Sequence, residues 1–225
     1  MTDRHPDASD AASDAAPRRG LFVRLAGAAA LGVAGLLPTL SAKPVKAAQS
    51  DSPAWPGKLK GQYHQVFDAY EVNAGWPLVF AYTFLNTNDP GTAAAVVVLR
   101  ATALPVALGS AMWEKYRIGE SLKIIDPETK APAVKNPFLH PKPGVLRADG
   151  TAVDRLLASG VVFGACNQAL HGISRMLAGD AGVSADDAAK EWAANVIPGI
   201  TIIPSGVWGL NRAQTGGCTY CTGGG

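Results

Sequence analysis

The residues with the clearest capacity for chemistry are three cysteines: Cys166 in "GVVFGACNQAL", and Cys218 and Cys221 in the C-terminal "GCTYC". A C-x-x-C spacing is found in redox dithiols, in half of a metal site and in local disulfides. Cys166 instead stands alone, after an apolar run. The sequence therefore offers two candidate centres of thiol chemistry.

Cys166 lies where a buried strand is expected to end and a helix to begin. Ligands of parallel α/β sheets bind at this edge, and the free amides and dipole of a helix N-terminus favour an anion there. A thiolate in this place is suited to nucleophilic attack or to carrying a sulfur atom. The alternative is a small apolar core residue, because free cysteine is among the most buried residue types.

Four polar residues are candidates for binding a substrate beside Cys166. Asn167 and Gln168 open the expected helix, where they would either hydrogen-bond a substrate or cap the turn. His64 and Asp68 flank the end of the first expected strand and are predicted to reach the same edge. The alternative is that both are ordinary polar residues of a strand end.

For Cys218 and Cys221, an oxidising compartment favours a local disulfide. Two alternatives stay open: one of these thiols resolves a species on Cys166, or the pair itself exchanges thiols and disulfides. A metal site is not expected, because structural zinc usually takes four ligands and the histidines are scattered. No cofactor is expected either.

The first 47 residues resemble a twin-arginine export signal. Residues 1–20 are polar and are expected to be disordered. Arg18-Arg19 then opens the apolar run "LFVRLAGAAALGVAGLLPTL", and Val45-Lys46-Ala47 offers the small residues that a signal peptidase accepts. We therefore expect an exported, periplasmic protein; an uncleaved membrane anchor is the alternative, which the glycines of the run disfavour.

Charge and length limit the remaining possibilities. Six of the 20 basic and four of the 18 acidic residues lie in residues 1–47, which leaves 14 of each. Because this part has no stretch dense in Lys and Arg, nucleic acid is not an expected partner. After a linker at 48–60, residues 61–225 suffice for one well-buried core, so a single domain is predicted.

Strands and helices are expected to alternate along this domain. Short apolar runs such as "AAAVVVL" and "VVFGAC" are typical of strands buried on both faces, and helices are expected between them, one of them running from Pro105 to Leu122. The pattern predicts a three-layer α/β/α fold with a mostly parallel sheet of about five strands. Residues 126–150 carry five prolines and are expected to form either a lid or a well-packed surface crossing.

The segments "GVVFGACNQAL", "IPSGVWGLNRAQTGG" and "CTYC" resemble the DsrE-like family of small α/β sulfur-handling proteins, over about Tyr63 to Tyr220. The resemblance implies this fold, a homo-oligomer (trimer or hexamer), and a persulfide on Cys166 that is exchanged with a donor or acceptor protein or a small thiol. The relay members of the family are cytoplasmic, and their pattern lacks the leader, the Pro-rich segment and the C-x-x-C.

Together these observations favour an exported sulfur-relay or thiol protein, either sulfurtransferase-like or a sulfur carrier, with Cys166 as persulfide carrier or nucleophile. A second hypothesis is a non-catalytic module of the cell envelope that binds a ligand or a protein through the Pro-rich segment and an oligomer interface. A third is thiol–disulfide exchange through Cys218 and Cys221.

Overall fold

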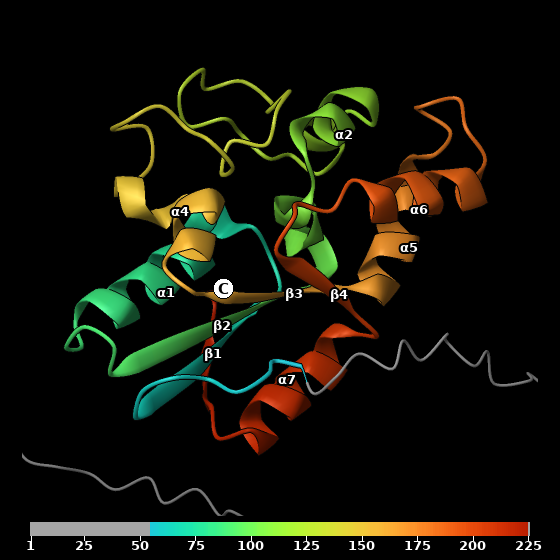
Figure 1. The fold of residues 1–225 in the computed structure, drawn as a ribbon. Coiled ribbons are helices and arrows are strands. Elements are labelled where there is room, and N and C mark those ends of the chain that lie inside the picture. Colours follow the sequence, from blue (N-terminus) through green and yellow to red (C-terminus); the bar gives the residue numbers. More distant parts are fainter. Residues whose placement is uncertain (1–54, 225) are drawn as a thin grey trace, which may run out of the picture. The chain divides into compact units, whose positions relative to one another are not determined.

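A five-stranded sheet forms the centre of residues 55–224, the part of the chain that the computed structural model describes. The strand order is β4-β3-β2-β1-β5, and every neighbouring pair is parallel (Figure 1). The predicted three-layer α/β fold with about five strands is thereby confirmed. The strands are β1 (Tyr63–Ala69), β2 (Ala93–Leu99), β3 (Val162–Cys166), β4 (Ile200–Ile203) and β5 (Thr219–Thr222).

Alternating side chains of the strands supply two separate apolar clusters, one on each face of the sheet. Phe67, Val97 and Phe163 belong to the larger cluster, whereas Val66 and Val96 belong to the smaller one. Because successive strand residues point to opposite faces, a continuous apolar run such as β2 contributes to both. This explains why these runs contain almost no polar residue.

Helices cover the two faces unequally. One helix, α7 (Gly206–Thr215), packs on the face of the smaller cluster, and the other six α-helices contribute to the larger cluster (Figure 1). These are α1 (Trp76–Asn86), α2 (Ser110–Lys115), α3 (Ile118–Ser121), α4 (Val153–Ala158), α5 (Asn167–Leu177) and α6 (Ala185–Ala194), with 3₁₀ turns at η1 (Asn73–Gly75), η2 (Ala101–Ala107) and η3 (Asp149–Thr151).

The helix expected from Pro105 to Leu122 is wrong as a single element. Pro105 lies inside the 3₁₀ turn η2, and Gly109 precedes α2 in an extended conformation. Arg117 has a left-handed backbone (φ 47°), which separates α2 from α3. Apolar spacing alone did not predict these two breaks.

Helix α6 lies in the polar segment "SADDAAKEWAANVI", where the composition did not predict a helix. Ser184 caps it by accepting a hydrogen bond from the amide of Asp187 at 3.1 Å. On the buried side of α6, Trp192 meets the ring of Tyr116 edge-on, with ring centroids 5.4 Å apart.

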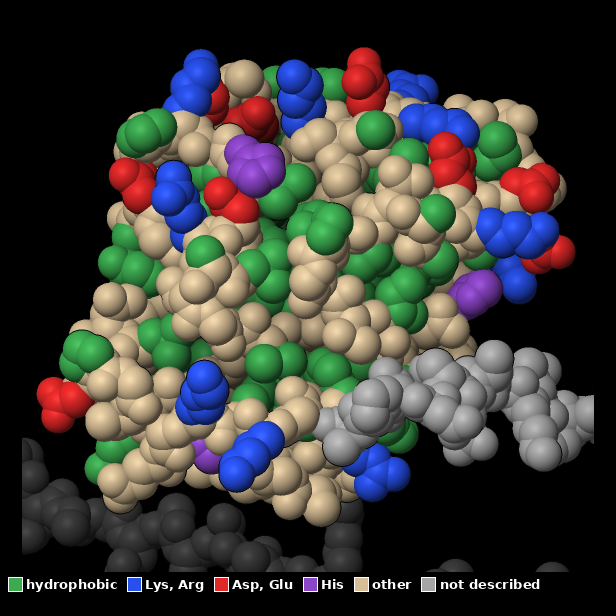
Figure 2. Space-filling model, in the orientation of Figure 1, with side chains coloured by type: hydrophobic (Ala, Val, Ile, Leu, Met, Phe, Trp, Pro, Cys, Tyr) green, Lys and Arg blue, Asp and Glu red, His purple; other side chains and the backbone are tan. Residues whose placement is uncertain are grey.

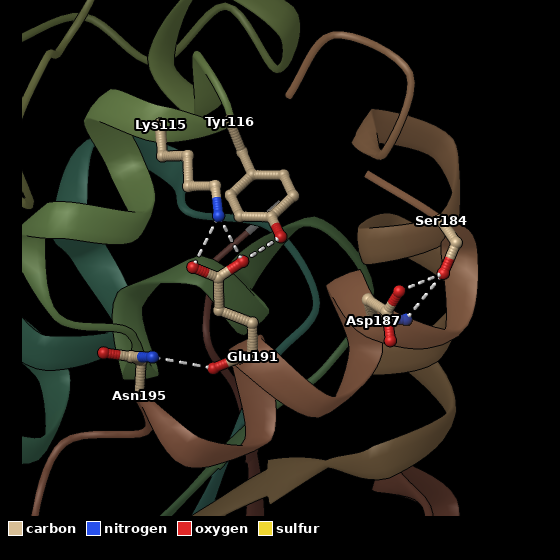
Figure 3. Close-up of polar contacts among 6 residues, drawn as sticks. All are labelled: Lys115, Tyr116, Ser184, Asp187, Glu191 and Asn195. Carbon is tan, nitrogen blue, oxygen red and sulfur yellow. Dashed lines mark hydrogen bonds and ion pairs between the residues drawn. The ribbon is translucent and has the colours of Figure 1, made fainter. Parts of the chain in front are cut away.

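An ion pair joins α6 to α2 (Figure 3). Lys115 Nζ lies 2.7 Å from both carboxylate oxygens of Glu191, and the hydroxyl of Tyr116 donates to the same carboxylate at 2.6 Å. The hydrogen bonds from Lys115 and then Tyr116 lower the pKa of Glu191. The pKa of Tyr116 is raised, first by burial and then by its bond to Glu191.

The Pro-rich segment 126–150 contains no α-helix or strand and is anchored in the core at its middle. Asn136 is 6% exposed, and its amide donates to the carbonyls of Val106 and Leu108 at 3.0 and 2.8 Å. Its side-chain oxygen accepts from the amide of Phe138, whose ring is buried. These contacts favour the well-packed crossing over the freely opening lid.

Charged side chains of both signs lie along the upper margin of the face drawn in Figure 2, over the Pro-rich segment and α2. Apolar and uncharged atoms occupy more of the middle of this face. In the part of the chain that is described, every helix is too short or too polar to cross a bilayer. The predicted leader and the disorder expected in residues 1–20 lie outside the described residues.

The predicted domain boundary at residue 61 leaves out one core residue. Trp55 is 6% exposed and belongs to the smaller cluster, with its ring centroid 6.3 Å from that of Trp208. Gly164 of β3 and Gly209 of α7 make room for it, since a Cβ at either position would lie 2.6 or 3.2 Å from the indole. Part of the expected linker at 48–60 is therefore structural.

Candidate functional site

The strand order reverses between β1 and β5, and β3 and β4 form the other side of the sheet, where two helices begin. The helix after β3, α5, lies on one face, whereas α7, which follows β4, lies on the other (Figure 1). Ligands of parallel α/β sheets bind at the carboxyl edge of the strands, where these two helices begin. Cys166 ends β3 at this edge and is paired with Ile203, the last residue of β4.

Cys166 also caps helix α5. Its sulfur accepts a hydrogen bond from the amide of Ala169 at 3.3 Å, in the position that Ser or Asp more often takes. The residue is 5% exposed. After the neighbouring strand β4, Ser205 caps α7 in the same way, accepting from the amide of Trp208 at 3.2 Å. Two helices therefore begin at the ends of neighbouring strands, and the Cys166 thiol caps one of them.

The structure places Asn167 and Gln168 in the first turn of α5, next to Cys166, with Asn167 half-buried and Gln168 exposed. A role for either in binding a substrate stays a prediction.

Asp68 lies at the carboxyl end of β1, as predicted, and forms an ion pair with a residue that sequence reasoning missed. Arg100 follows β2 directly, and its Nε and Nη2 donate to the two carboxylate oxygens of Asp68 at 2.6 and 2.8 Å. The hydroxyl of Tyr220, from β5, donates to the same carboxylate at 3.1 Å. A basic residue directly after a buried strand was the signal that could have identified Arg100.

Electrostatics of this cluster follow from the buried carboxylate. The hydrogen bond to Asp68 raises the pKa of Arg100. Desolvation and then the hydrogen bond to Asp68 raise the pKa of Tyr220. The guanidinium of Arg100 also lies 4.6 Å from the ring centroid of Tyr70. The Asp68 carboxylate thus binds two side chains, Arg100 and Tyr220, and Arg100 in turn lies over the ring of Tyr70.

Arg100 links the Asp68 carboxylate to the region around Cys166 and the start of α7. Since Leu99 pairs with Ala165, Arg100 and Cys166 occupy the next positions of neighbouring strands. The stem of Arg100 lies against Gly206, the first residue of α7, where a Cβ would come within 2.5 Å of it. A side chain at position 206 would displace Arg100, so the glycine is needed for this close approach.

The prediction that His64 reaches the Cys166 edge is wrong. His64 is the second residue of β1 and lies at the amino end of the sheet, with Nε2 3.0 Å from the carbonyl of Gly61. The strand register puts it six positions from the level of Cys166, or about 20 Å along the strands. The strand is long enough to carry His64 and Asp68 to opposite edges.

The disulfide expected between Cys218 and Cys221 is also wrong, because all three cysteines are free thiols. Cys218 is buried in the smaller cluster, and Cys221 packs against the larger one on the opposite face. Burial raises the pKa of the Cys218 thiol. Two residues on opposite faces of a sheet cannot form a disulfide or act together as a redox dithiol.

Resolution of Cys166 by Cys221 or Cys218 is excluded by the strand order. Three strand spacings separate β3 from β5, which is about 14 Å between strand axes, whereas a disulfide needs Cα atoms within about 7 Å. Within residues 55–224, there is no group of three or more His, Cys, Asp or Glu side chains arranged to hold a metal ion.

Comparison with known proteins adds a fold likeness only. No protein-family model matches the chain, and no curated protein matches it. Among solved structures, it is similar to MTH1491, a protein of unknown function from Methanobacterium thermoautotrophicum. The likeness has 18% sequence identity and a TM-score of 0.39, and covers 71% of this chain and 98% of the archaeal one.

Proposed function

We propose that this is an exported thiol protein in which Cys166 accepts a sulfane sulfur atom and passes it on, as its resemblance to the DsrE-like family implies. The observation that carries the proposal is the place of Cys166: its sulfur caps α5 at the carboxyl end of β3 in an all-parallel sheet. Amides at a helix N-terminus favour negative charge, and both a thiolate and a persulfide anion carry it.

The proposed step needs no external oxidant. The Cys166 thiolate attacks the outer sulfur of a donor persulfide, so that a new S–S bond forms on Cys166 as the donor S–S bond breaks. The electron pair of the broken bond leaves with the donor, which departs as a thiolate and takes up a proton. Transfer to an acceptor thiol is the same reaction in reverse.

Arg100 is proposed as a positioning residue rather than a catalytic one. Its bidentate pair with Asp68 fixes the guanidinium on the strand next to Cys166, and its stem packs against the first residue of α7. The pair would hold the end of β2 and the start of α7 in place beside Cys166 while a sulfur donor approaches.

Burial of Cys166 limits which donors react. With 5% of the residue exposed, a small polysulfide reaches the sulfur more readily than a bulky reagent does. A protein donor would have to present its persulfide on a narrow segment.

Intact-mass measurement tests the proposal. After treatment with polysulfide, the wild-type protein should gain the mass of one sulfur atom, which a reductant removes and which Cys166→Ser abolishes. Cys221→Ser is the matched control, because it removes a more exposed thiol three strands away, and it should retain the gain. A sulfur carried by Cys218 or Cys221, or by none of the three, contradicts the proposal.

Export and assembly belong to the same proposal and are tested separately. Export rests on Arg18-Arg19 and the apolar run after them, so replacing both with lysine should keep the protein in the cytoplasm. The resemblance implies a trimer or hexamer, which native mass spectrometry distinguishes from a monomer.

A further inference from the structure

A cavity of about 310 Å³ lies between the first turn of α1 and the Pro-rich segment. Gly75, Leu78 and Val79 line it from the α1 side, and Phe138 and Leu146 line it from the segment. Of these, Gly75, Leu78 and Phe138 are buried, so its floor is apolar. Cys166 is not among the lining residues, and the inference is independent of the proposed sulfur chemistry.

The rim of this cavity is positively charged. Lys130 and Arg147 line it, and its lining contains no Asp or Glu. The guanidinium of Arg147 lies 4.2 Å from the ring centroid of Trp76, the first residue of α1. This stacking holds the charge close to the cavity, and it leaves the donor hydrogens at the guanidinium edge available to an anion.

The first turn of α1 adds to the positive potential. The helix begins after Gly75, which has no side chain, and its first turn carries no acidic residue. The amide of Trp76 donates to the carbonyl of Asn73 and Pro77 has no N–H, so the helix dipole supplies the positive potential here. The turn therefore presents the positive end of an eleven-residue helix without a compensating carboxylate. Lys130, Arg147 and the N-terminus of α1 thus all lie around one apolar cavity.

The cavity is preformed. Asn136 and Phe138 anchor the Pro-rich segment in the core, and Gly75 (φ 85°) makes room for the Phe138 ring, which a Cβ at that position would approach to 2.9 Å. A binding site that is already shaped loses less conformational entropy when a ligand enters.

We propose that this cavity binds a small organic carboxylate with an apolar body. The body would occupy the floor at Leu78 and Phe138, and the carboxylate would lie between Lys130, Arg147 and the first turn of α1. Its volume is at the lower end of the range typical of small-molecule sites. A densely charged anion such as phosphate fits poorly, because the apolar floor offers it no hydrogen bonds.

Binding is tested with 4-phenylbutyrate and its neutral analogue 4-phenylbutan-1-ol, followed through the backbone amide NMR signals of the full chain. The acid should shift the signals of Gly75, Leu78 and Thr151, which line the cavity. The alcohol should bind the cavity at least about tenfold more weakly than the acid does. Equal binding of the two compounds, or shifts from the acid elsewhere only, overturns the proposal.

Two variants distinguish the contribution of the positive charge to binding from that of the shape of the cavity. Arg147→Gln should weaken the acid about tenfold and leave the alcohol unchanged, whereas Val145→Phe, which fills the cavity, should weaken both. Lys135→Gln is the matched control, because Lys135 is an exposed cation of the same segment outside this cavity. If Lys135→Gln lowers the affinity as much as Arg147→Gln does, the site is not the one proposed.

Discussion

Arg100 and Asp68 form a two-point ion pair at the carboxyl edge of the sheet, with N–O distances of 2.6 and 2.8 Å and only 6% of the Asp68 side chain exposed. The pair joins β1 to β2, and Tyr220 extends it to β5. Three of the five strands are thus tied together at the edge where Cys166 lies.

Replacing Asp68 should destabilise the protein. Asp68→Asn removes the charge that compensates a guanidinium of which 24% is exposed, and we expect a loss of about 2 kcal/mol in the free energy of unfolding. Urea denaturation measures it. The control is Arg117→Gln, which breaks a pair with Glu120 whose two side chains are about 60% exposed; its loss should stay below about 0.5 kcal/mol. Equal losses would mean that burial of the pair is irrelevant.

Gly206 and Gly172 provide a second comparison. An alanine Cβ at Gly206 would lie 2.6 Å from Cβ of Arg100, so Gly206→Ala should cost about 2 kcal/mol through overpacking. Gly172 lies within α5 with open space around it, and Gly172→Ala should stabilise the protein by about 1 kcal/mol. Thermal unfolding of both variants measures the difference; a neutral Gly206→Ala would refute the close packing.

The two C-terminal cysteines should behave as unrelated thiols. Cys218→Ser puts a hydroxyl into an apolar cluster and should cost about 1–2 kcal/mol, whereas Cys221→Ser, on a half-buried position, should be nearly neutral. A reductant should leave the melting temperature of the wild-type protein unchanged. A reductant-sensitive melting temperature would instead indicate a disulfide, and with it a different position of β5.

Glu191 should give the protein a defined acid sensitivity. Its folded pKa is lowered by Lys115 and Tyr116, so its contribution is complete above the ordinary value of 4.5 and is lost as the pH falls through the lower folded value. Glu191→Gln should therefore cost about 1 kcal/mol at neutral pH. Its deficit relative to the wild type should shrink below about pH 4.5.

Urea denaturation from pH 3 to pH 7 measures this deficit, with Glu120→Gln as the exposed control. A deficit that is the same at every pH would show that the carboxylate charge of Glu191 does not contribute.

The strands were predictable from the sequence because their side chains are buried on both faces. Apolar runs such as 93–99 and 162–166 have few other structures open to them, and the strand-to-helix position of Cys166 follows directly. The break between α2 and α3 was not predictable, because it depends on the left-handed backbone of Arg117. The link between Arg100 and Asp68 spans 32 residues, which no local pattern reveals.

The expected disulfide failed because the chain is extended where the two cysteines lie. Cys221 is in β5, and Cys218 directly precedes this strand. Residues three apart in an extended chain face opposite sides of a sheet, and the two thiols accordingly pack in different apolar clusters. The prediction for His64 failed for a different reason, because the position of His64 along the sheet depends on where β1 begins.

Trp55 has a practical consequence for how the chain can be shortened. Its ring fills the space above Gly164 and Gly209 and covers Ile203 on the face that a single helix protects. A fragment that starts at residue 61 would lack the Trp55 ring. It would expose the apolar surface that the ring covers to water, which promotes aggregation. A fragment made for crystallisation should therefore retain Trp55.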